Sequence, residues 1–544
     1  MRSRTESGKG LLAVIEQLNN VTGIQSASPN LIQAANYQPT QQSLLNAATE
    51  QRTAIDPKQL ITNLPRLSNS PYPDSLLPYQ WHLDSRFRKT TPGQRTDVRA
   101  LEAWAKGDRG KGVVVAVIDS LIQWDHPDLQ NTVYQVPQNL PDLLPGERYG
   151  WDFSGLEQEQ TCRANTPNSC APGDPDTRLN PAELAALKPH FQRMFEPDNQ
   201  VLKNYAELAN QIRRMYPQWS SAKVATLIRR IVLNAISSEF HGTWVAGVVA
   251  ANPQISGGVV GVAPNAKILP VRFFGLGGEI AADGLVEAIG YAAARGADVI
   301  NLSLGSLLPT QAEADQIFAV LDQHPNLVIV ASSGNEDVDG AGYPAAVPGV
   351  LSVGASNLAG QRSSYSNFGR RLDLMAPGGD TSLNQSGGIL TTGGTWISGF
   401  WEGMTIPKYS WEPAFDPLGK YVQVQGTSFS SPVVAGVVAL MKGEDPQRQL
   451  TREQMRQILL KTASYQPLKI TQKDKNYYRL QQGIPSGQAF IPDIGFVPIA
   501  NPGIDQPGSK LPIEQYYFGN GLVNAAAAVD AVKQQVQTVN GKKR

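Results

Sequence analysis

Two hydrophobic patterns alternate along the chain between residues 96 and 376. One consists of short, continuous apolar runs rich in β-branched residues, which is typical of strands buried on both faces. The other has apolar positions at helical spacing, as in DGLVEAIGYAAARG (283–296), which ends on glycine as helices commonly do. Strand–helix alternation predicts an α/β fold with a mostly parallel central sheet and helices on both faces. The predicted strands are VVVAVID (113–119), AKILPVRFF (266–274), DVINLSL (298–304), NLVIVASS (326–333) and VLSVGAS (350–356).

Two long segments interrupt this alternation. Residues 131–240 begin as loop-like sequence, and from Pro181 to Ile236 they carry helical patterns with little strand signal. Because the segment falls between elements that otherwise belong together, we expect a helical surface insertion. Residues 378–425 are rich in Gly, Ser, Thr and Trp, and we expect an irregular segment there.

The length of 544 residues favours one large domain with appendages. Residues 1–75 are polar and rich in Pro, Gln and Asn, so we expect the large domain at 76–535 and a polar tail at 536–544. No apolar run is long enough to span a bilayer, and the start lacks the apolar core of a secretory signal. The protein is therefore expected to be intracellular or to have lost an export signal.

Charge and cysteine content narrow the choice of partner and compartment. Lysine plus arginine equals aspartate plus glutamate, 47 against 47, without a long block of one sign, so the sequence gives no electrostatic case for nucleic acid or an anionic membrane. Cys162 and Cys170 lie in one polar segment without further cysteines. They predict a local disulfide and an oxidising compartment, with a pair of unlinked surface thiols as the alternative.

Two residues of types used in acid–base catalysis stand at strand and helix ends. A general base near neutral pH is most often histidine, and only five are present. His241 opens HGTWVAGVVAA, whose small residues allow another element to approach the predicted helix. Asp119 ends the run VVVAVID, at the sheet edge where α/β proteins place catalytic groups. Singly, each has a plain structural explanation: a packing or surface histidine, and a helix-capping or loop aspartate.

Two further candidates stand one or two positions after a glycine. Ser428 in GTSFSSPVVAGVVALM stands near the start of a predicted helix, where the helix dipole favours a developing oxyanion. Asn335 in ASSGNED follows a predicted strand and can direct its NH₂ group at an external oxygen. A helix-capping serine and a turn asparagine are the alternatives.

Taken together, these motifs and their order resemble those of the subtilisin-like serine peptidases, the subtilases. The resemblance covers roughly residues 76–532 and implies a subtilisin-like fold. The order Asp, His, Ser is the one known for subtilisin and differs from that of chymotrypsin. The matching motifs are VAVIDS (115–120), HPDL (126–129), HGTWVAG (241–247), GVAP (261–264), NLSLG (301–305), ASSGN (331–335), GTSFSSPVVAG (426–436) and YFGNGLVNAAAAV (517–529).

The resemblance implies a role for each candidate. Ser428 would attack the scissile carbonyl, His241 would transfer its proton, and Asp119 would orient the imidazole. Asn335 and the Ser428 N–H would stabilise the oxyanion. The small, uncharged walls implied for the specificity pocket suggest broad specificity with a preference for large uncharged side chains. Those walls are Ser303, Leu304, Gly305, Ala331, Ser332, Ser333 and Gly334, while Gly277 and Gly278 would pair with substrate backbone as an edge strand.

The chain departs from the family pattern near the predicted site. Leu121 stands where the family usually has glycine, and it could reshape the turn beside Asp119. Phe429 replaces the commoner methionine after the serine. The 122 positions from Asp119 to His241 exceed the spacing in compact family members, so the insertion would lie near one end of the cleft.

The resemblance also bears on cofactors and processing. No cofactor is required for the chemistry, and Asp128 matches a position that supplies a structural calcium ligand in some subtilases. Residues 10–32 look like the last helix and strand of a propeptide that acts in cis. A truncated precursor of a secreted or periplasmic protein would reconcile the missing signal with a disulfide. The protein is expected to act on polypeptides as a monomer.

Two other functions stay open at this point. A subtilase fold retained for binding or scaffolding would use the inserted helices as its functional surface, and Leu121 is the only nearby feature that favours it. A generic serine esterase is the other, although the cleft motifs resemble those of peptidases.

Overall fold

The central sheet of the computed structural model is seven-stranded and entirely parallel, with the order β11-β10-β9-β8-β2-β6-β3. Its strands are β2 (Val114–Asp119), β3 (Trp151–Asp152), β6 (Lys267–Arg272), β8 (Val299–Leu302), β9 (Val328–Ser332), β10 (Val350–Ser356) and β11 (Leu374–Pro377). The structure describes residues 33–34, 72, 75–87, 95–155, 160–162, 170–253, 258–280, 282–305, 310–369, 371–381, 387–404, 418–482, 488–491, 495–498 and 511–542.

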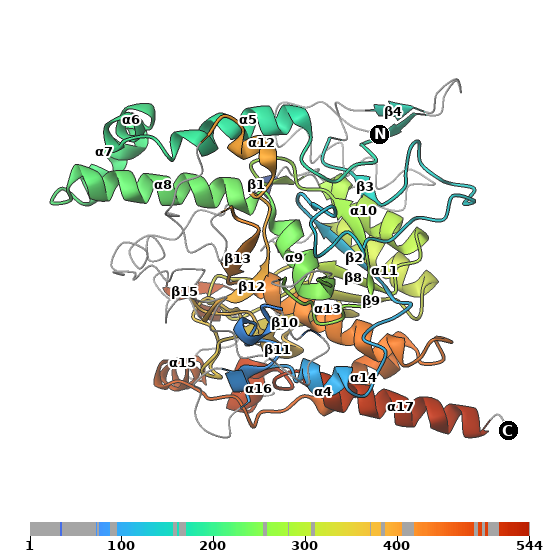
Figure 1. Cartoon of the computed structure of the whole chain (residues 1–544). Coiled ribbons are helices and arrows are strands. Elements are labelled where there is room, and N and C mark those ends of the chain that lie inside the picture. Colours follow the sequence, from blue (N-terminus) through green and yellow to red (C-terminus); the bar gives the residue numbers. More distant parts are fainter. Residues whose placement is uncertain are drawn as a thin grey trace, which may run out of the picture.

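Helices cover both faces of this sheet (Figure 1). Val115 and Val117 of β2 belong to one apolar cluster, whereas Ala116 and Ile118 belong to another on the opposite face, as the alternation of side chains along a strand requires. The first cluster includes α9 (His241–Ala250) and α13 (Thr427–Gly443), and the second includes α10 (Ala282–Ala294) and α11 (Gln311–Gln323). The predicted fold class is therefore confirmed.

The remaining elements surround this core. The helices are α4 (Ala100–Trp104), α12 (Ser398–Trp401), α14 (Arg452–Thr462), α15 (Gln472–Gln482), α16 (Ile513–Phe518) and α17 (Ala525–Lys542), with 3₁₀ turns η1 (Leu77–Tyr79) and η2 (Ser85–Phe87). Four antiparallel pairs are β1 (Gln33–Ala34) with β7 (Glu279–Ile280), β4 (Gln160–Cys162) with β5 (Cys170–Pro172), β12 (Ile389–Thr392) with β13 (Tyr421–Val424), and β14 (Gln488–Ile491) with β15 (Gly495–Pro498).

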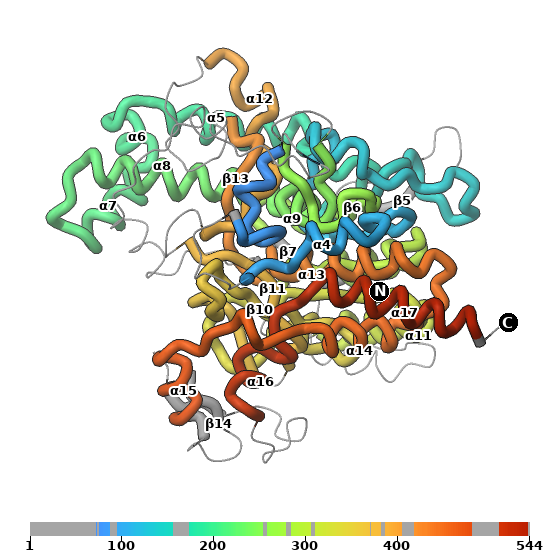
Figure 2. Tube along the Cα trace, turned by 60° about the horizontal axis from the view of Figure 1, so that its bottom comes forward, coloured from blue at the N-terminus to red at the C-terminus, as the bar shows by residue number. Residues whose placement is uncertain are grey.

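Helices α5 (Pro181–Arg193), α6 (Asp198–Asn204), α7 (Ala206–Met215) and α8 (Ser221–Ser238) form the second half of the expected insertion. Asn180 and Glu183 form a capping box at the start of α5. Helices α6, α7 and α8 project from one side of the molecule in both ribbon views (Figures 1 and 2). The helical pattern predicted from Pro181 to Ile236 is confirmed.

Three expectations about organisation differ from the structure. Trp151 and Asp152, expected in a loop of the insertion, form the edge strand β3, and their main chains pair with β6. The segment 378–425 contains the β12·β13 pair and α12. The expected polar tail is mostly the end of α17, because Val536 and Val539 continue the packing of this helix on the core.

None of the helices in the described part of the chain combines the length and the hydrophobicity that crossing a membrane requires. The propeptide-like segment 10–32 lies outside the described residues.

Candidate active site

Asp119 occupies the carboxyl end of the central strand β2 and is fully buried. Parallel strands place their carboxyl ends at one edge of the sheet, where helices begin and ligands bind. One oxygen of this carboxylate, Oδ1, accepts a hydrogen bond from the Ser120 N–H at 2.7 Å and lies 2.7 Å from the His241 Nδ1. The main-chain N–H of Ser120 thus helps to hold the Asp119 carboxylate in the position where it faces the imidazole.

His241 is the first residue of α9, and its side chain keeps 24% of its surface exposed. A carboxylate only accepts hydrogen bonds, so the Nδ1 that faces Asp119 carries a proton. The neutral ring then presents Nε2 as an acceptor, which is the tautomer a general base needs. The rings of Trp244 and Phe429 flank the imidazole, with centroids at 6.0 and 5.4 Å.

Ser428 is the second residue of α13 and is partly exposed. The His241–Phe429 contact shows that the N-termini of α9 and α13 meet, because Phe429 directly follows Ser428. At this helix terminus the backbone N–H groups lack intrahelical partners and the helix dipole is positive. Gly426, with φ of 147°, adopts the backbone conformation from which the helix starts.

Asn335 follows β9 and is oriented by the first residue of α13. Its Oδ1 accepts hydrogen bonds from the Thr427 N–H at 2.9 Å and the Thr427 hydroxyl at 3.0 Å. Because the amide oxygen is held in this way, the exposed NH₂ group remains available as a donor beside Ser428. The structure thus brings Asp119, His241, Ser428 and Asn335 together at one sheet edge.

The predicted pocket walls come from the ends of β8 and β9, which pair with Leu302 opposite Ala331. The Ser332 hydroxyl donates to the Leu304 carbonyl at 3.1 Å and ties the two walls together. Gly305 is exposed, whereas Ala331 and Ser333 are fully buried, and Gly334, with φ of 110°, turns the chain into Asn335.

Ser303 was expected to line the pocket, but its side chain is buried and faces α13. Its hydroxyl donates to the Ser428 carbonyl at 2.7 Å and lies 3.0 Å from the Ser431 hydroxyl. Asn301 Nδ2 donates to the same hydroxyl at 2.8 Å. Ser303 therefore supports the main chain of Ser428, a contact that its sequence neighbours did not indicate.

The edge-strand prediction for Gly277 and Gly278 is wrong. Both residues have left-handed φ angles, 80° and 74°, and they form a turn. A chain in this conformation cannot pair with a substrate as an extended strand. The Gly277 N–H donates to the Glu239 carboxylate at 3.0 Å. The extended residues are the next two, Glu279 and Ile280 of β7, which pair with Gln33 and Ala34 of β1.

Leu121 does not reshape the turn but anchors the insertion. It is 1% exposed and packs in an apolar cluster with Phe191, Phe240 and Phe400. Its carbonyl accepts from the Thr243 N–H at 3.0 Å, and its N–H donates to the Glu239 carbonyl at 3.2 Å. Its backbone φ is not positive, so glycine is not required here. The residues beside Asp119 and His241 thus share one core with the inserted helices.

A buried arginine, which the sequence did not single out as a candidate, also joins the insertion to the sheet. Arg272 ends β6, opposite Asp119 in register, and is 2% exposed. It forms ion pairs with Asp152 at 3.0 Å and Glu183 at 2.6 Å. A buried guanidinium is retained only when such partners satisfy it. The available signal in AKILPVRFF was a basic residue that stands between the apolar run ILPV and two phenylalanines.

Asp128, the predicted calcium ligand, is buried, and burial raises its pKa. Its Oδ2 accepts from the Val259 N–H at 3.0 Å, while the amide of Asn252 donates to the Pro264 carbonyl. Calcium takes six to eight oxygen ligands, and the described residues contain no cluster of three acidic, His or Cys side chains that could hold a metal. Residues 254–257 of this loop lie outside the described part, so the calcium site stays a prediction.

His126 of the same motif is a structural residue. Its Nε2 lies 3.0 Å from the Lys420 carbonyl, and its Nδ1 accepts from the Asp128 N–H at 3.1 Å. These partners require the neutral tautomer with the proton on Nε2. Burial lowers the pKa of His126 to about 3.

The two cysteines lie opposite each other in the β4·β5 pair, where Cys162 is the register partner of Cys170. This backbone register is favourable for a cross-strand disulfide. The disulfide itself stays a prediction, because the cysteine side chains lie outside the described set.

Comparison with known proteins places these features in a family. Residues 110–488 match the Subtilase family. Subtilisin NAT of Bacillus subtilis subsp. natto is 34% identical over 41% of this chain and 51% of its own length. The cell wall-associated protease of Bacillus subtilis is 29% identical over 56% of this chain and 28% of its own length. A solved protease of Pseudoalteromonas arctica covers 84% of this chain and 97% of its own, with 24% identity and a TM-score of 0.49.

The chain thus spans about half or less of the length of these two curated relatives. The family match covers more than half of the chain and includes the Asp119, His241 and Ser428 motifs. The chain belongs to the Subtilase family.

Proposed function

We propose that the protein is a serine endopeptidase that hydrolyses peptide bonds with Asp119, His241 and Ser428. The observation that carries this proposal is the 2.7 Å contact between the buried Asp119 carboxylate and His241 Nδ1, at the point where the helix of Ser428 begins. Membership of the Subtilase family supports it.

In the proposed reaction, Ser428 Oγ attacks the scissile carbonyl carbon while His241 Nε2 takes the hydroxyl proton. The resulting imidazolium is stabilised by Asp119, which keeps its own negative charge. His241 then returns the proton to the leaving amine, and the acyl-enzyme forms. A water molecule then attacks the ester carbonyl and loses a proton to His241. The bond to Ser428 Oγ breaks, the acid product leaves, and His241 returns the proton to Ser428 Oγ, which regenerates the serine.

The oxyanion that forms in each tetrahedral intermediate would accept hydrogen bonds from the Asn335 NH₂ group and the Ser428 N–H. Thr427 supports this role, because its two hydrogen bonds to Asn335 Oδ1 orient the amide before substrate binds. Preorganised donors of this kind contribute about 10²–10³ in rate.

The substrate class we propose is extended polypeptide with large uncharged side chains at the primary pocket. The predicted walls, Leu304, Gly305 and Gly334 among them, contain no acidic residue that would select a basic side chain. The edge strand β7, rather than Gly277 and Gly278, would pair with substrate backbone.

We also propose that the N-terminal segment acts in cis as a propeptide. The β1·β7 pair supports this, because Gln33 and Ala34 lie antiparallel along the same edge that substrate would use. Release of the segment would then precede full activity. Secretion into an oxidising compartment is part of the same proposal, together with the Cys162–Cys170 disulfide.

The scaffold alternative has lost its supporting observation. Leu121 was the one feature that favoured it, and the burial of Leu121 against the insertion explains its presence by packing.

Peptide hydrolysis by matured protein tests the proposal. We expect casein cleavage by the wild type, cleavage sites after large uncharged residues in a peptide library, and no cleavage by Ser428→Ala. A wild-type protein that cleaves neither casein nor library peptides after removal of its N-terminal segment would contradict it.

A further inference from the structure

The outer helices of the insertion form a small body of their own, which we call the arm (residues 198–238). Its helices α6, α7 and α8 enclose an apolar cluster that contains Val201, Ile212, Val224 and Ile228 and is separate from the sheet cores. In two views the arm projects beyond the rest of the described chain (Figures 1 and 2). Such a projection adds little to the core and offers a surface to a partner.

Charge is strongly segregated along the arm, although the whole chain is neutral. Residues 208–238 contain five basic residues and no Asp or Glu. One of the five, Arg229, is buried and pairs with Asp198 at 2.7 Å, so it belongs to the internal structure. Net neutrality of 47 against 47 therefore conceals a local cationic surface.

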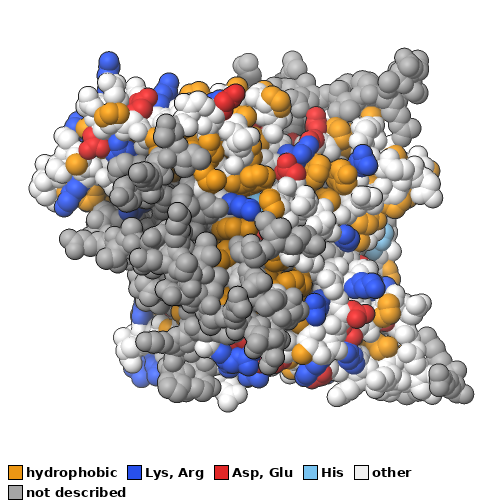
Figure 3. Space-filling model, viewed as in Figure 1, with side chains coloured by type: hydrophobic (Ala, Val, Ile, Leu, Met, Phe, Trp, Pro, Cys, Tyr) orange, Lys and Arg blue, Asp and Glu red, His pale blue; other side chains and the backbone are white. Residues whose placement is uncertain are grey.

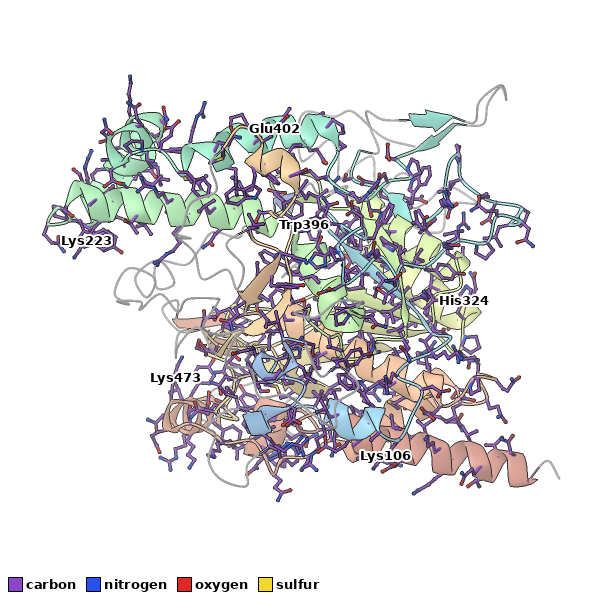
Figure 4. The ribbon with its side chains drawn as sticks, viewed as in Figure 1. Lys106, Lys223, His324, Trp396, Glu402 and Lys473 are labelled. Atoms are coloured by element: carbon purple, nitrogen blue, oxygen red, sulfur yellow. The ribbon has the colours of Figure 1, made fainter. Side chains whose placement is uncertain are left out.

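Three of these cations lie exposed at the outer end of the arm. Arg213 and Arg214 lie in the last turn of α7, and Lys223 is the third residue of α8. Within the described part of the chain, none of the three forms an ion pair. Lys223 stands at the end of α8 farthest from the sheet (Figure 4), and Figure 3 shows blue side chains on this projecting region, with red ones among them.

Apolar and aromatic side chains lie among these cations. Met215 is 45% exposed, an unusual state for a large apolar residue of this chain. The half-buried rings of Tyr216 and Trp219 stack beside it, with centroids 4.3 Å apart and planes 12° apart. Amphipathic rings, an exposed methionine and unpaired cations together are typical of surfaces that enter the headgroup region of a bilayer.

We propose that the outer end of the arm, residues 213–223, binds an anionic lipid surface. The cations would attract the headgroups, and Met215 with the edges of the aromatic pair would enter the interface. An acidic polypeptide held by the two arginines is the other occupant that this chemistry allows. The exposed Met215 and the aromatic pair among the cations favour the lipid surface, because such side chains can enter its apolar boundary. This inference goes beyond the proposed peptidase function and does not depend on it.

The length of α8 determines how far the proposed catalytic centre would lie from the bound lipid surface. Helix α8 has 18 residues, which corresponds to about 27 Å at about 1.5 Å per residue. Only Glu239 and Phe240 separate it from His241. A lipid surface at the outer end would therefore leave the catalytic residues at about the length of α8 from the bound tip.

Vesicle co-sedimentation of the full chain tests the proposal, with Ser428→Ala as background to prevent self-cleavage. We expect binding to vesicles of phosphatidylglycerol and phosphatidylcholine in equal parts, and none to pure phosphatidylcholine. A triple variant, R213Q/R214Q/K223Q, should lose about 100-fold in partition coefficient, since each charge near an anionic surface contributes about fivefold. Met215→Ser should lose a further few-fold.

The matched control is K111Q/K461Q/K475Q, which removes three exposed lysines that lie outside the arm and lack ion pairs in the described structure. It should bind vesicles as the parent does. Raising salt from about 0.1 M to about 1 M shortens the Debye length from about 10 Å to about 3 Å and should release the parent protein.

Equal binding by the arm triple variant and the control variant would overturn the proposal, as would equal binding to neutral vesicles. Binding to polyglutamate that requires Arg213, Arg214 and Lys223, without any vesicle binding, would assign the surface to acidic polypeptides and overturn it too. Hydrolysis of a small peptide by the same variants in the wild-type background keeps this result separate from the proposed peptidase function.

Discussion

The proposed catalytic centre and the arm are built on opposite principles. At the catalytic centre, single atoms are held in place from several elements: Asp119 by a strand, His241 and Ser428 by two helix starts, and Asn335 by Thr427. In the arm, three helices share a small core, and the exposed cations Arg213, Arg214 and Lys223 form no ion pair within the residues that the structure describes. The proposed catalytic centre requires particular residues at particular positions. The arm requires only exposed cations in sufficient number and a projecting shape.

The two regions meet in one apolar cluster. Leu121 lies two positions after Asp119, Phe240 lies one before His241, and both pack against helices of the insertion. This shared core shows how a subtilase accommodates a long insertion between its aspartate and its histidine. Substitutions in the two regions should therefore differ in their effects on catalysis and on stability.

Asp119→Asn should have the largest effect among them. An amide in place of the carboxylate can donate to Nδ1, which stabilises the wrong tautomer of His241, so kcat should fall by about 10⁴. Hydrolysis of a chromogenic peptide measures it. Asp322→Asn, the same change on the exposed surface of α11, is the control and should keep full activity. Comparable losses in the two variants would mean that the 2.7 Å contact has no catalytic role.

His126→Gln should change the acid stability of the core. The folded pKa of His126, about 3, lies below the ordinary value of 6.5 because the ring is buried. The unfolded chain therefore binds more protons between these pH values, and stability rises with pH from about 3 to 6.5. We expect urea unfolding to show a stability loss of several kcal/mol as pH falls through this window. The variant should lose the share of the slope that belongs to His126, about 1.4 kcal/mol per pH unit, while the buried His82, whose pKa is also lowered to about 3, keeps its own share. An unchanged slope would contradict the assignment.

Asn335→Ala should lower kcat by about 10²–10³ and leave KM nearly unchanged, because the lost donor acts on the oxyanion and not on the bound substrate. Asn234→Ala, the same truncation on the exposed surface of α8, should leave both constants at the wild-type level. A rise in KM without a fall in kcat would assign Asn335 to substrate binding instead.

Leu121→Ala should lower the free energy of unfolding by about 2–4 kcal/mol, because the buried side chain leaves a cavity. We also expect kcat/KM to fall about tenfold, since small shifts of reacting groups are costly. Leu227→Ala makes the same truncation inside the arm cluster. It should destabilise the arm and leave kcat/KM unchanged. Equal kinetic effects of both variants would show that the arm couples to catalysis through more than Leu121.

Ser303→Ala should give the smallest effect. Loss of the hydrogen bonds to the Ser428 carbonyl and Ser431 should reduce kcat about fivefold, the equivalent of about 1 kcal/mol. KM should not change, because the side chain faces α13 and not the pocket. Ser303→Thr should restore most of the activity. A shift in the preferred substrate residue instead would place Ser303 in the pocket after all.

The sequence located the four neighbouring residues of the proposed catalytic centre better than it located their surroundings, for a physical reason. Asp119, His241, Ser428 and Asn335 lie within contiguous motifs whose spacing follows from strand and helix ends. The five strands read as largely apolar runs, because both faces of the sheet are buried. By contrast, β3 has two residues, too few for any pattern, and its place depends on the partner strand β6.

Other features depend on contacts between distant segments. Leu121 could be recognised as unusual, but its partners in α5, α8 and α12 could not be read from its neighbours. Gly277 and Gly278 were expected to be extended, whereas the turn that places β7 requires their positive φ angles. Arg272 pairs with Asp152, 120 positions away in the chain, and with Glu183, 89 positions away.

The central claim is that Ser428 is a nucleophile activated by His241 and Asp119. Fluorophosphonate labelling of the matured protein, followed by peptide mass spectrometry, tests it most directly. The account predicts a single adduct on Ser428 in the wild type, no adduct on Ser428→Ala, and labelling slowed by orders of magnitude in Asp119→Asn. An unlabelled wild type, or an adduct on another serine that survives in Ser428→Ala, would contradict it.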